Sequence, residues 1–79
     1  MRILYVYEGE RKAALEDEVL KMLSARHGGV RQVETHSGEG GMTTVTLEAD
    51  EADAAEIVEA LRGHGDLLDA AQGSLGEGV

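Results

Sequence analysis

Residues 2–8, Arg-Ile-Leu-Tyr-Val-Tyr-Glu, decide the fold that this 79-residue sequence predicts. The stretch is rich in β-branched and aromatic residues and stops at Gly9, a pattern typical of a β-strand. Its side chains alternate between two faces, and both faces are apolar. One face carries Leu4 and Val6, and the other carries Ile3, Tyr5 and Tyr7. A strand that is apolar on both faces is typical of the middle of a sheet.

Helix and strand patterns alternate after this first strand. Apolar residues at spacings of three and four predict the helices, and a period of two predicts the strands. Gly28-Gly29 ends the first helix, and Asp50 is a good N-cap for the second. The expected elements are a helix over 10–27, strands over 30–36 and 42–49 joined by a glycine-rich turn, a helix from Asp50 to about residue 65, and a short strand over 66–72.

The element order βαββαβ predicts an α+β sandwich with a four-stranded antiparallel sheet and both helices on one face. Right-handed crossovers favour the ferredoxin-like arrangement, which places the first and third strands in the centre. We expect a single domain over residues 1–72 and a flexible C-terminal tail over 73–79.

Two helices on one face leave the other face of the sheet bare. We expect Leu4 and Val6 of the first strand to point toward the helices. The other apolar residues of this strand then lie on the bare face, together with two threonines of the third strand. The predicted bare-face residues are Ile3, Tyr5, Tyr7, Thr44 and Thr46. Because an exposed apolar centre needs a partner, this assignment predicts a homodimer through the sheet. The opposite alternation, with both tyrosines in the core, is the alternative.

Composition excludes several classes of function. The chain has no cysteine, so it has no disulfide, no thiolate zinc site and no cysteine nucleophile. Its formal net charge of −9 argues against binding to a phosphate backbone, so no nucleic-acid partner is expected. The longest apolar run is too short for a membrane span, and we expect a soluble, cytoplasmic protein without membrane contact. The acidic residues favour solubility over docking to a basic partner, which stays open as the alternative.

Candidate metal and catalytic residues are few. His36 and His64 are expected at the same end of the domain as the turn Glu8-Gly9-Glu10, where they could contribute to a metal site if they converged. No two histidines have the helical spacing of four that preorganises such a site, so we expect no metal. No serine has a nucleophile context, and the glycine-rich turn over 38–41 lacks the features of a phosphate loop. The sequence therefore predicts neither catalytic residues nor a cofactor, and not an enzyme.

Three features give the chain a resemblance to known regulatory domains. They are Gly9 after the first strand, Gly29-Val30 opening the second, and the glycine-rich turn before Met42-Thr-Thr-Val-Thr-Leu. On these features, residues 2–72 resemble the βαββαβ modules of the ACT type, the related NIL domains and the effector modules of leucine-responsive-type regulators. The resemblance implies binding of an amino acid or another small effector at a domain interface, commonly in a dimer. Glu8-Gly9-Glu10 stands where ACT domains have an Asp-x-Pro-Gly turn.

Two hypotheses about function follow. The first is a non-enzymatic regulatory or binding module with its ligand site at Glu8, Gly9 and Glu10. Amides at the start of a helix hold an anionic group, and a neighbouring acid holds an ammonium group. The second is a protein-interaction or assembly module without a small ligand, which uses the bare sheet face or the acidic helix surface.

Overall fold

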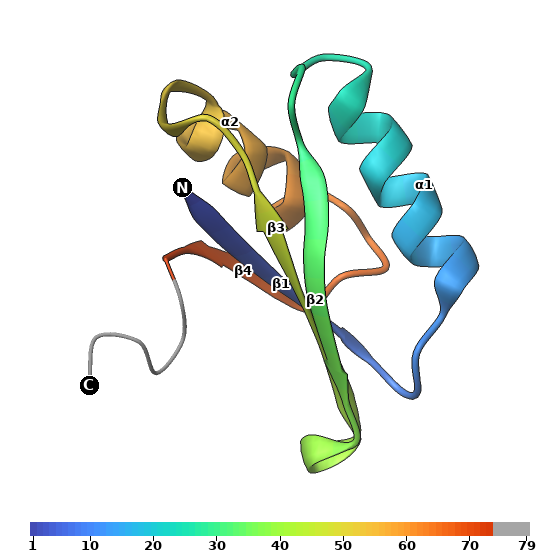
Figure 1. Cartoon of the computed structure of the whole chain (residues 1–79). Coiled ribbons are helices and arrows are strands. Elements are labelled where there is room, and N and C mark those ends of the chain that lie inside the picture. The colour runs from blue at the N-terminus through green and yellow to red at the C-terminus, as the bar shows by residue number, and fades with distance from the viewer. Residues whose placement is uncertain (74–79) are drawn as a thin grey trace.

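The computed structural model describes residues 1–73, and all of their side chains except that of Glu39. It forms one sheet of four strands and two α-helices (Figure 1). This confirms the α+β class and the order of the elements. Of the flexible tail predicted over 73–79, all but Gly73 lies outside the described residues. The elements are β1 (Arg2–Glu8), α1 (Ala13–Ser24), β2 (Arg31–Ser37), the 3-10 helix η1 (Glu39–Gly41), β3 (Met42–Glu48), α2 (Glu51–Arg62) and β4 (Asp69–Gln72).

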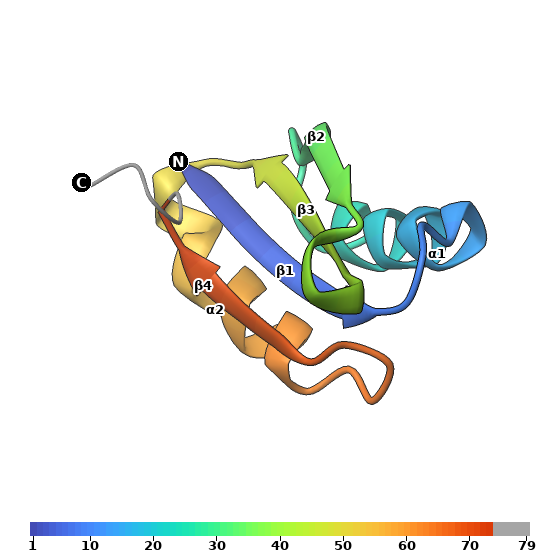
Figure 2. The ribbon, with the colours of Figure 1, turned by 90° about the horizontal axis from the view of Figure 1, so that it is seen from below.

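The sheet has the strand order β2-β3-β1-β4, and all neighbouring strands are antiparallel. Strands β1 and β3 are central, as predicted, and β2 and β4 form the two edges (Figure 2). The central position of β1 explains why both of its faces are apolar, because side chains on both sides of a central strand lie among neighbours.

Two elements begin later than the sequence pattern predicts. Helix α1 begins at Ala13 instead of Glu10, because Gly9 takes a positive φ of 93° and Lys12 is extended. Strand β4 begins only at Asp69. Within residues 1–73, no helix has the length and apolar character to cross a membrane, since α1 and α2 have 12 residues each.

The core lies between the sheet and both helices, which pack against the same face. On α1 the buried apolar residues are Val19 and Leu23, and α2 contributes four residues at helical spacing. The core residues of the sheet alternate along β1 and β3, as a period of two requires. The cluster comprises Ile3, Tyr5, Tyr7, Val19, Leu23, Val30, Val45, Leu47, Ala49, Ala54, Ile57, Val58, Leu61 and Ala70.

The predicted orientation of β1 is wrong. Ile3, Tyr5 and Tyr7 are each 0% exposed and pack against the helices, so they do not lie on the uncovered face. Leu4 and Val6 lie on that face instead. Burial of an aromatic ring removes more apolar area from water than burial of Leu or Val, so the larger side chains occupy the side that the helices cover. A homodimer interface made by the tyrosines is thereby excluded.

The two threonines of β3 do lie on the uncovered face, as predicted. Residues that are directly opposite in an antiparallel pair share a face. Thr46 is opposite Leu4, and Thr44 is opposite Val6. Strand β3 is less ambiguous than β1 because its polar and apolar residues alternate from Thr44 to Glu48.

Candidate functional site

The predicted ligand turn is exposed, and its glycine is held by the neighbouring loop. The amide of Gly9 donates to the carbonyl of Gly41 at 2.8 Å, and the Gly9 carbonyl accepts a hydrogen bond from Thr43 Oγ1 at 2.8 Å. Glu8 and Glu10 point into solvent. Because α1 starts only at Ala13, this turn is separate from the helix start, and the Gly9 amide is already occupied.

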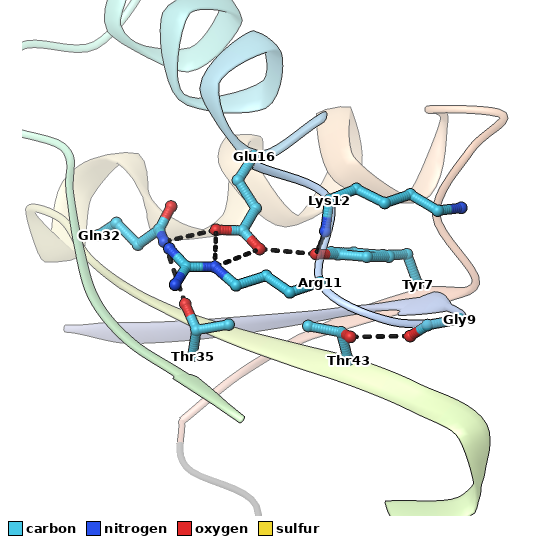
Figure 3. A network of polar contacts seen from close by, with 8 residues as sticks. All are labelled: Tyr7, Gly9, Arg11, Lys12, Glu16, Gln32, Thr35 and Thr43. Carbon is cyan, nitrogen blue, oxygen red and sulfur yellow. Dashed lines mark hydrogen bonds and ion pairs between the residues drawn. The ribbon is translucent and has the colours of Figure 1, made fainter. Parts of the chain in front are cut away.

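A buried carboxylate lies next to the loop between β1 and α1 (Figure 3). Glu16 of α1 is only 3% exposed, and it accepts hydrogen bonds from three other segments of the chain. Tyr7 Oη donates to its Oε2 at 2.6 Å, and Gln32 Nε2 donates to its Oε1 at 2.9 Å. Arg11 Nε lies 3.2 Å from Oε1 and 3.4 Å from Oε2. The Glu16 network therefore ties α1 to β1, to β2 and to the loop between β1 and α1.

The protonation states of this network follow from its contacts. Burial is the largest single influence on Glu16 and by itself raises the pKa. The hydrogen bonds from Tyr7 and Gln32, together with the charge of Arg11, outweigh it and lower the pKa of Glu16 below its ordinary value. Burial and the hydrogen bond to Glu16 raise the pKa of Tyr7. At neutral pH the carboxylate is ionised, the phenol is neutral, and the network is a structural contact without a free general base.

Tyr5 differs from Tyr7 in its polar contacts. Its hydroxyl group is buried without a hydrogen-bond partner, and it is the one such side-chain atom within residues 1–73. Burial, followed by the nearby charge of Glu16, raises the pKa of Tyr5 strongly. A buried hydroxyl without a partner costs stability, so the ring and not the hydroxyl is what holds Tyr5 in place.

The histidines do not converge on one site. His36 Nε2 lies 3.0 Å from Glu34 Oε2 on the exposed edge strand β2. His64 Nε2 lies 3.4 Å from Glu18 Oε2, and His64 Nδ1 accepts a hydrogen bond from the Asp66 amide at 3.2 Å. In that arrangement Nε2 carries the proton and points at Glu18, so neither ring nitrogen offers a lone pair to an ion. Although ligand atoms of Glu18, His64 and Asp66 lie within 4.8 Å of one another, their hydrogen bonds give no support for a metal site.

The uncovered face of the sheet carries a small apolar hollow. Leu4 and Val6 lie at its centre, with Thr44 and Thr46 beside them on β3. On the other side, Asp69 and Ala71 of β4 are opposite Val6 and Leu4. The hollow is lined by Leu4, Val6, Asp69, Ala70 and Ala71. Four of these five residues (Leu4, Val6, Ala70 and Ala71) are apolar, and the Asp69 carboxylate lies on the β4 side.

Sequence reasoning missed both the Glu16 network and the hollow. The sequence pattern does not separate Glu16 from the other acidic residues, which are expected to favour solubility. The position of Glu16 three residues before Val19 and seven before Leu23 places it on the apolar stripe, which is the available signal of a buried acid. The hollow carries no sequence signal of its own, because it depends on how Ala71 and Asp69 of the last strand are aligned with β1.

Comparisons of the chain with models of protein families, with curated proteins and with solved structures found no match.

Proposed function

We propose that this chain is a non-enzymatic binding module whose binding surface is the uncovered face of its sheet. The observation that carries the proposal is the apolar hollow between β1 and β4. It is the part of the uncovered face where apolar side chains and a carboxylate lie side by side. The turn at Gly9 is the weaker candidate, because its amide and carbonyl are bonded within the fold.

The lining of the hollow favours a small ligand with an apolar body and a cationic group. Leu4, Val6 and Ala71 offer apolar contacts, and the Asp69 carboxylate suits an ammonium group. The Asp69 side chain is 74% exposed. Its Oδ1 accepts a hydrogen bond from the Ala70 amide at 2.8 Å and lies 3.6 Å from Arg62 Nε, so a ligand cation competes with both groups for this carboxylate. An amino acid or a related amine has this combination of groups.

The strand order also supports a proposal about the fold family. A βαββαβ chain with the sheet order β2-β3-β1-β4 has the arrangement expected of a ferredoxin-like domain. We propose that the fold is of this kind and that the chain serves as a regulatory module similar to ACT and NIL domains. Fold analogy by itself is weak evidence about function, so the binding site has to be tested directly.

A second candidate function is docking of a protein surface on the same face. Met42 begins β3 opposite Glu8, on the same face as Val6 and Thr44, and it is 40% exposed. This side chain extends the apolar part of the uncovered face beyond the hollow. A protein partner would cover the whole strip, whereas a small ligand needs only the hollow.

A thermal-shift screen of amino acids and small amines tests the proposal. We expect at least one compound to raise the melting temperature of the wild type, because a bound ligand stabilises the folded state by mass action. The affinity of the Val6→Lys variant for that compound should be at least about tenfold lower than that of the wild type. Ala55→Lys adds the same charge on an exposed position of α2 and serves as the matched control. A compound that binds both variants equally contradicts the site, and a screen without any stabilising compound favours the protein-docking candidate.

A further inference from the structure

The outer edge of β4 is capped by side chains at Ala70. Gly73 pairs with Arg2 through a 2.7 Å backbone hydrogen bond, so by alternation Ala70 directs its amide and carbonyl away from β1. Both groups are capped by side chains: the Ala70 amide donates to Asp69 Oδ1 at 2.8 Å, and its carbonyl accepts from Arg62 Nε at 2.9 Å. At Ala70, side chains thus occupy the backbone groups that a further strand would use.

The outer edge of β2 lacks such caps. The amide of Gly38 donates to the carbonyl of Met42 at 3.2 Å, which fixes the alternation of the β2–β3 ladder. By this alternation Glu34 and His36 bond to β3, and Thr35 and Ser37 direct their amides and carbonyls outward. Among the side chains that the structure describes, none caps these outward groups as Asp69 and Arg62 cap Ala70.

We propose that β2 pairs with β2 of a second copy of this chain, antiparallel and with the two-fold axis at Thr35. In this register the two copies exchange both hydrogen bonds at Thr35, because its amide and carbonyl both point outward. Ser37 then lies opposite Val33 of the second copy. The axis is perpendicular to the sheet, so the two sheets become one of eight strands with all four helices on one side.

The charges of β2 select this register over its neighbours. Glu34 and His36 share the uncovered face, since they lie opposite Thr46 and Thr44. An axis at Thr35 places Glu34 of each copy opposite His36 of the other copy, which makes two such pairs. Both are non-hydrogen-bonded pairs, the type in which the side chains are closest. An axis one residue earlier places Glu34 opposite Glu34, and like charges directly opposite each other are unfavourable. An axis one residue later places His36 opposite His36 and leaves neither imidazole with a carboxylate opposite it.

The same strand also limits the strength of the contact. The register of β2 shifts between Gln32 and Glu34, so the bulge at Val33 ends the regular edge. Five residues of each copy, 33–37, remain for pairing, and the net charge of −9 on each copy opposes association. We therefore expect a dimer with a dissociation constant of about 10–500 µM, which salt strengthens at moderate concentration by screening this net repulsion.

Sedimentation equilibrium of the full chain, from 10 µM to 1 mM in 0.15 M salt, tests the proposal. Thr35→Pro removes an outward amide but no bond to β3, so it should weaken the dimer at least about tenfold while the circular dichroism spectrum stays native. Gln72→Pro is the matched control, because the Gln72 amide points outward on the opposite edge of the sheet. We expect the Gln72→Pro variant to dimerise as the wild type does.

A charge exchange tests the register independently of proline. His36→Glu places two acids opposite each other and should weaken the dimer at least about tenfold. The double variant Glu34→Lys/His36→Glu restores opposite charges and should recover most of the wild-type affinity. A wild-type chain that is monomeric at 1 mM overturns the proposal. So does a Thr35→Pro variant that dimerises as strongly as the wild type, and so does a double variant whose dimer affinity is no higher than that of His36→Glu. None of these outcomes bears on ligand binding in the hollow, which depends on β1 and β4.

Discussion

The double variant Tyr5→Ser/Tyr7→Ser will lose its cooperative fold. Both rings are 0% exposed and belong to the one core that the sheet shares with the two helices. Truncation of a buried aromatic side chain costs about 3–5 kcal/mol, and two such losses match the whole stability of about 5–15 kcal/mol of a small domain. Far-ultraviolet circular dichroism should show little helix and no cooperative melting transition. A cooperative transition within a few degrees of the wild type would contradict the buried position of the tyrosines.

Phenylalanine variants provide the control, because they keep both rings. Tyr5→Phe removes a buried hydroxyl group that has no partner, so the free energy of unfolding should stay the same or rise. Tyr7→Phe removes the donor to Glu16 and the acceptor for the Lys12 amide, and it should lower stability by about 1–3 kcal/mol. Urea unfolding at pH 7 separates the two results, and equal effects would contradict the different contacts of the two hydroxyl groups.

Replacement of the buried acid has the second largest expected effect. Glu16→Ala should lower the free energy of unfolding by about 3–5 kcal/mol, because Tyr7 and Gln32 lose their acceptor and Arg11 its partner charge. Asp17→Ala is the matched control, since Asp17 is the exposed neighbouring acid on the same helix. We expect a change within about 0.5 kcal/mol for that variant. Comparable losses in both would contradict the Glu16 network.

The pH dependence of stability tests the ionised state of Glu16. The pKa of Glu16 is lower in the folded chain than the value of about 4.3 in an unfolded chain, so the unfolded state binds its proton first as the pH falls. The stabilisation is therefore complete well above pH 4.3 and is lost as the pH falls from there through the folded-state pKa. Unfolding measured from pH 7 to pH 2.5 should show a steeper loss in the wild type than in Glu16→Gln. Parallel curves would contradict an ionised, hydrogen-bonded Glu16.

Local patterns of the sequence were enough to predict the elements and the centre of the sheet. From Thr44 to Glu48, strand β3 alternates between polar and apolar residues, so its buried face, with Val45 and Leu47, could be assigned. Strand β1 has no such contrast. Its two faces are both apolar, and only packing against the helices decides that the tyrosines and not Leu4 belong to the core cluster.

The candidate sites were harder to predict because they depend on contacts between distant segments. The hollow needs the alignment of β4 with β1, and the Glu16 network needs Gln32 of an edge strand. The turn at Gly9 was correctly expected after the first strand. Its bond to the Gly41 carbonyl, however, joins residues 32 positions apart that no local pattern relates.

The most direct measurement of the central claim, an uncovered and accessible sheet face, is the reactivity of single cysteines. The chain has no cysteine of its own, so Val6→Cys and Val45→Cys each give one thiol, on neighbouring central strands and on opposite faces. The thiols are reacted with a thiol-reactive disulfide reagent at micromolar protein concentration, with and without urea. The native Val6→Cys variant should react at a rate within about tenfold of its rate in urea. The native Val45→Cys variant should react at least about 100-fold more slowly than it does in urea, because its thiol is reached only by unfolding. Protection of Val6→Cys equal to that of Val45→Cys would contradict the uncovered face and the binding function proposed for it.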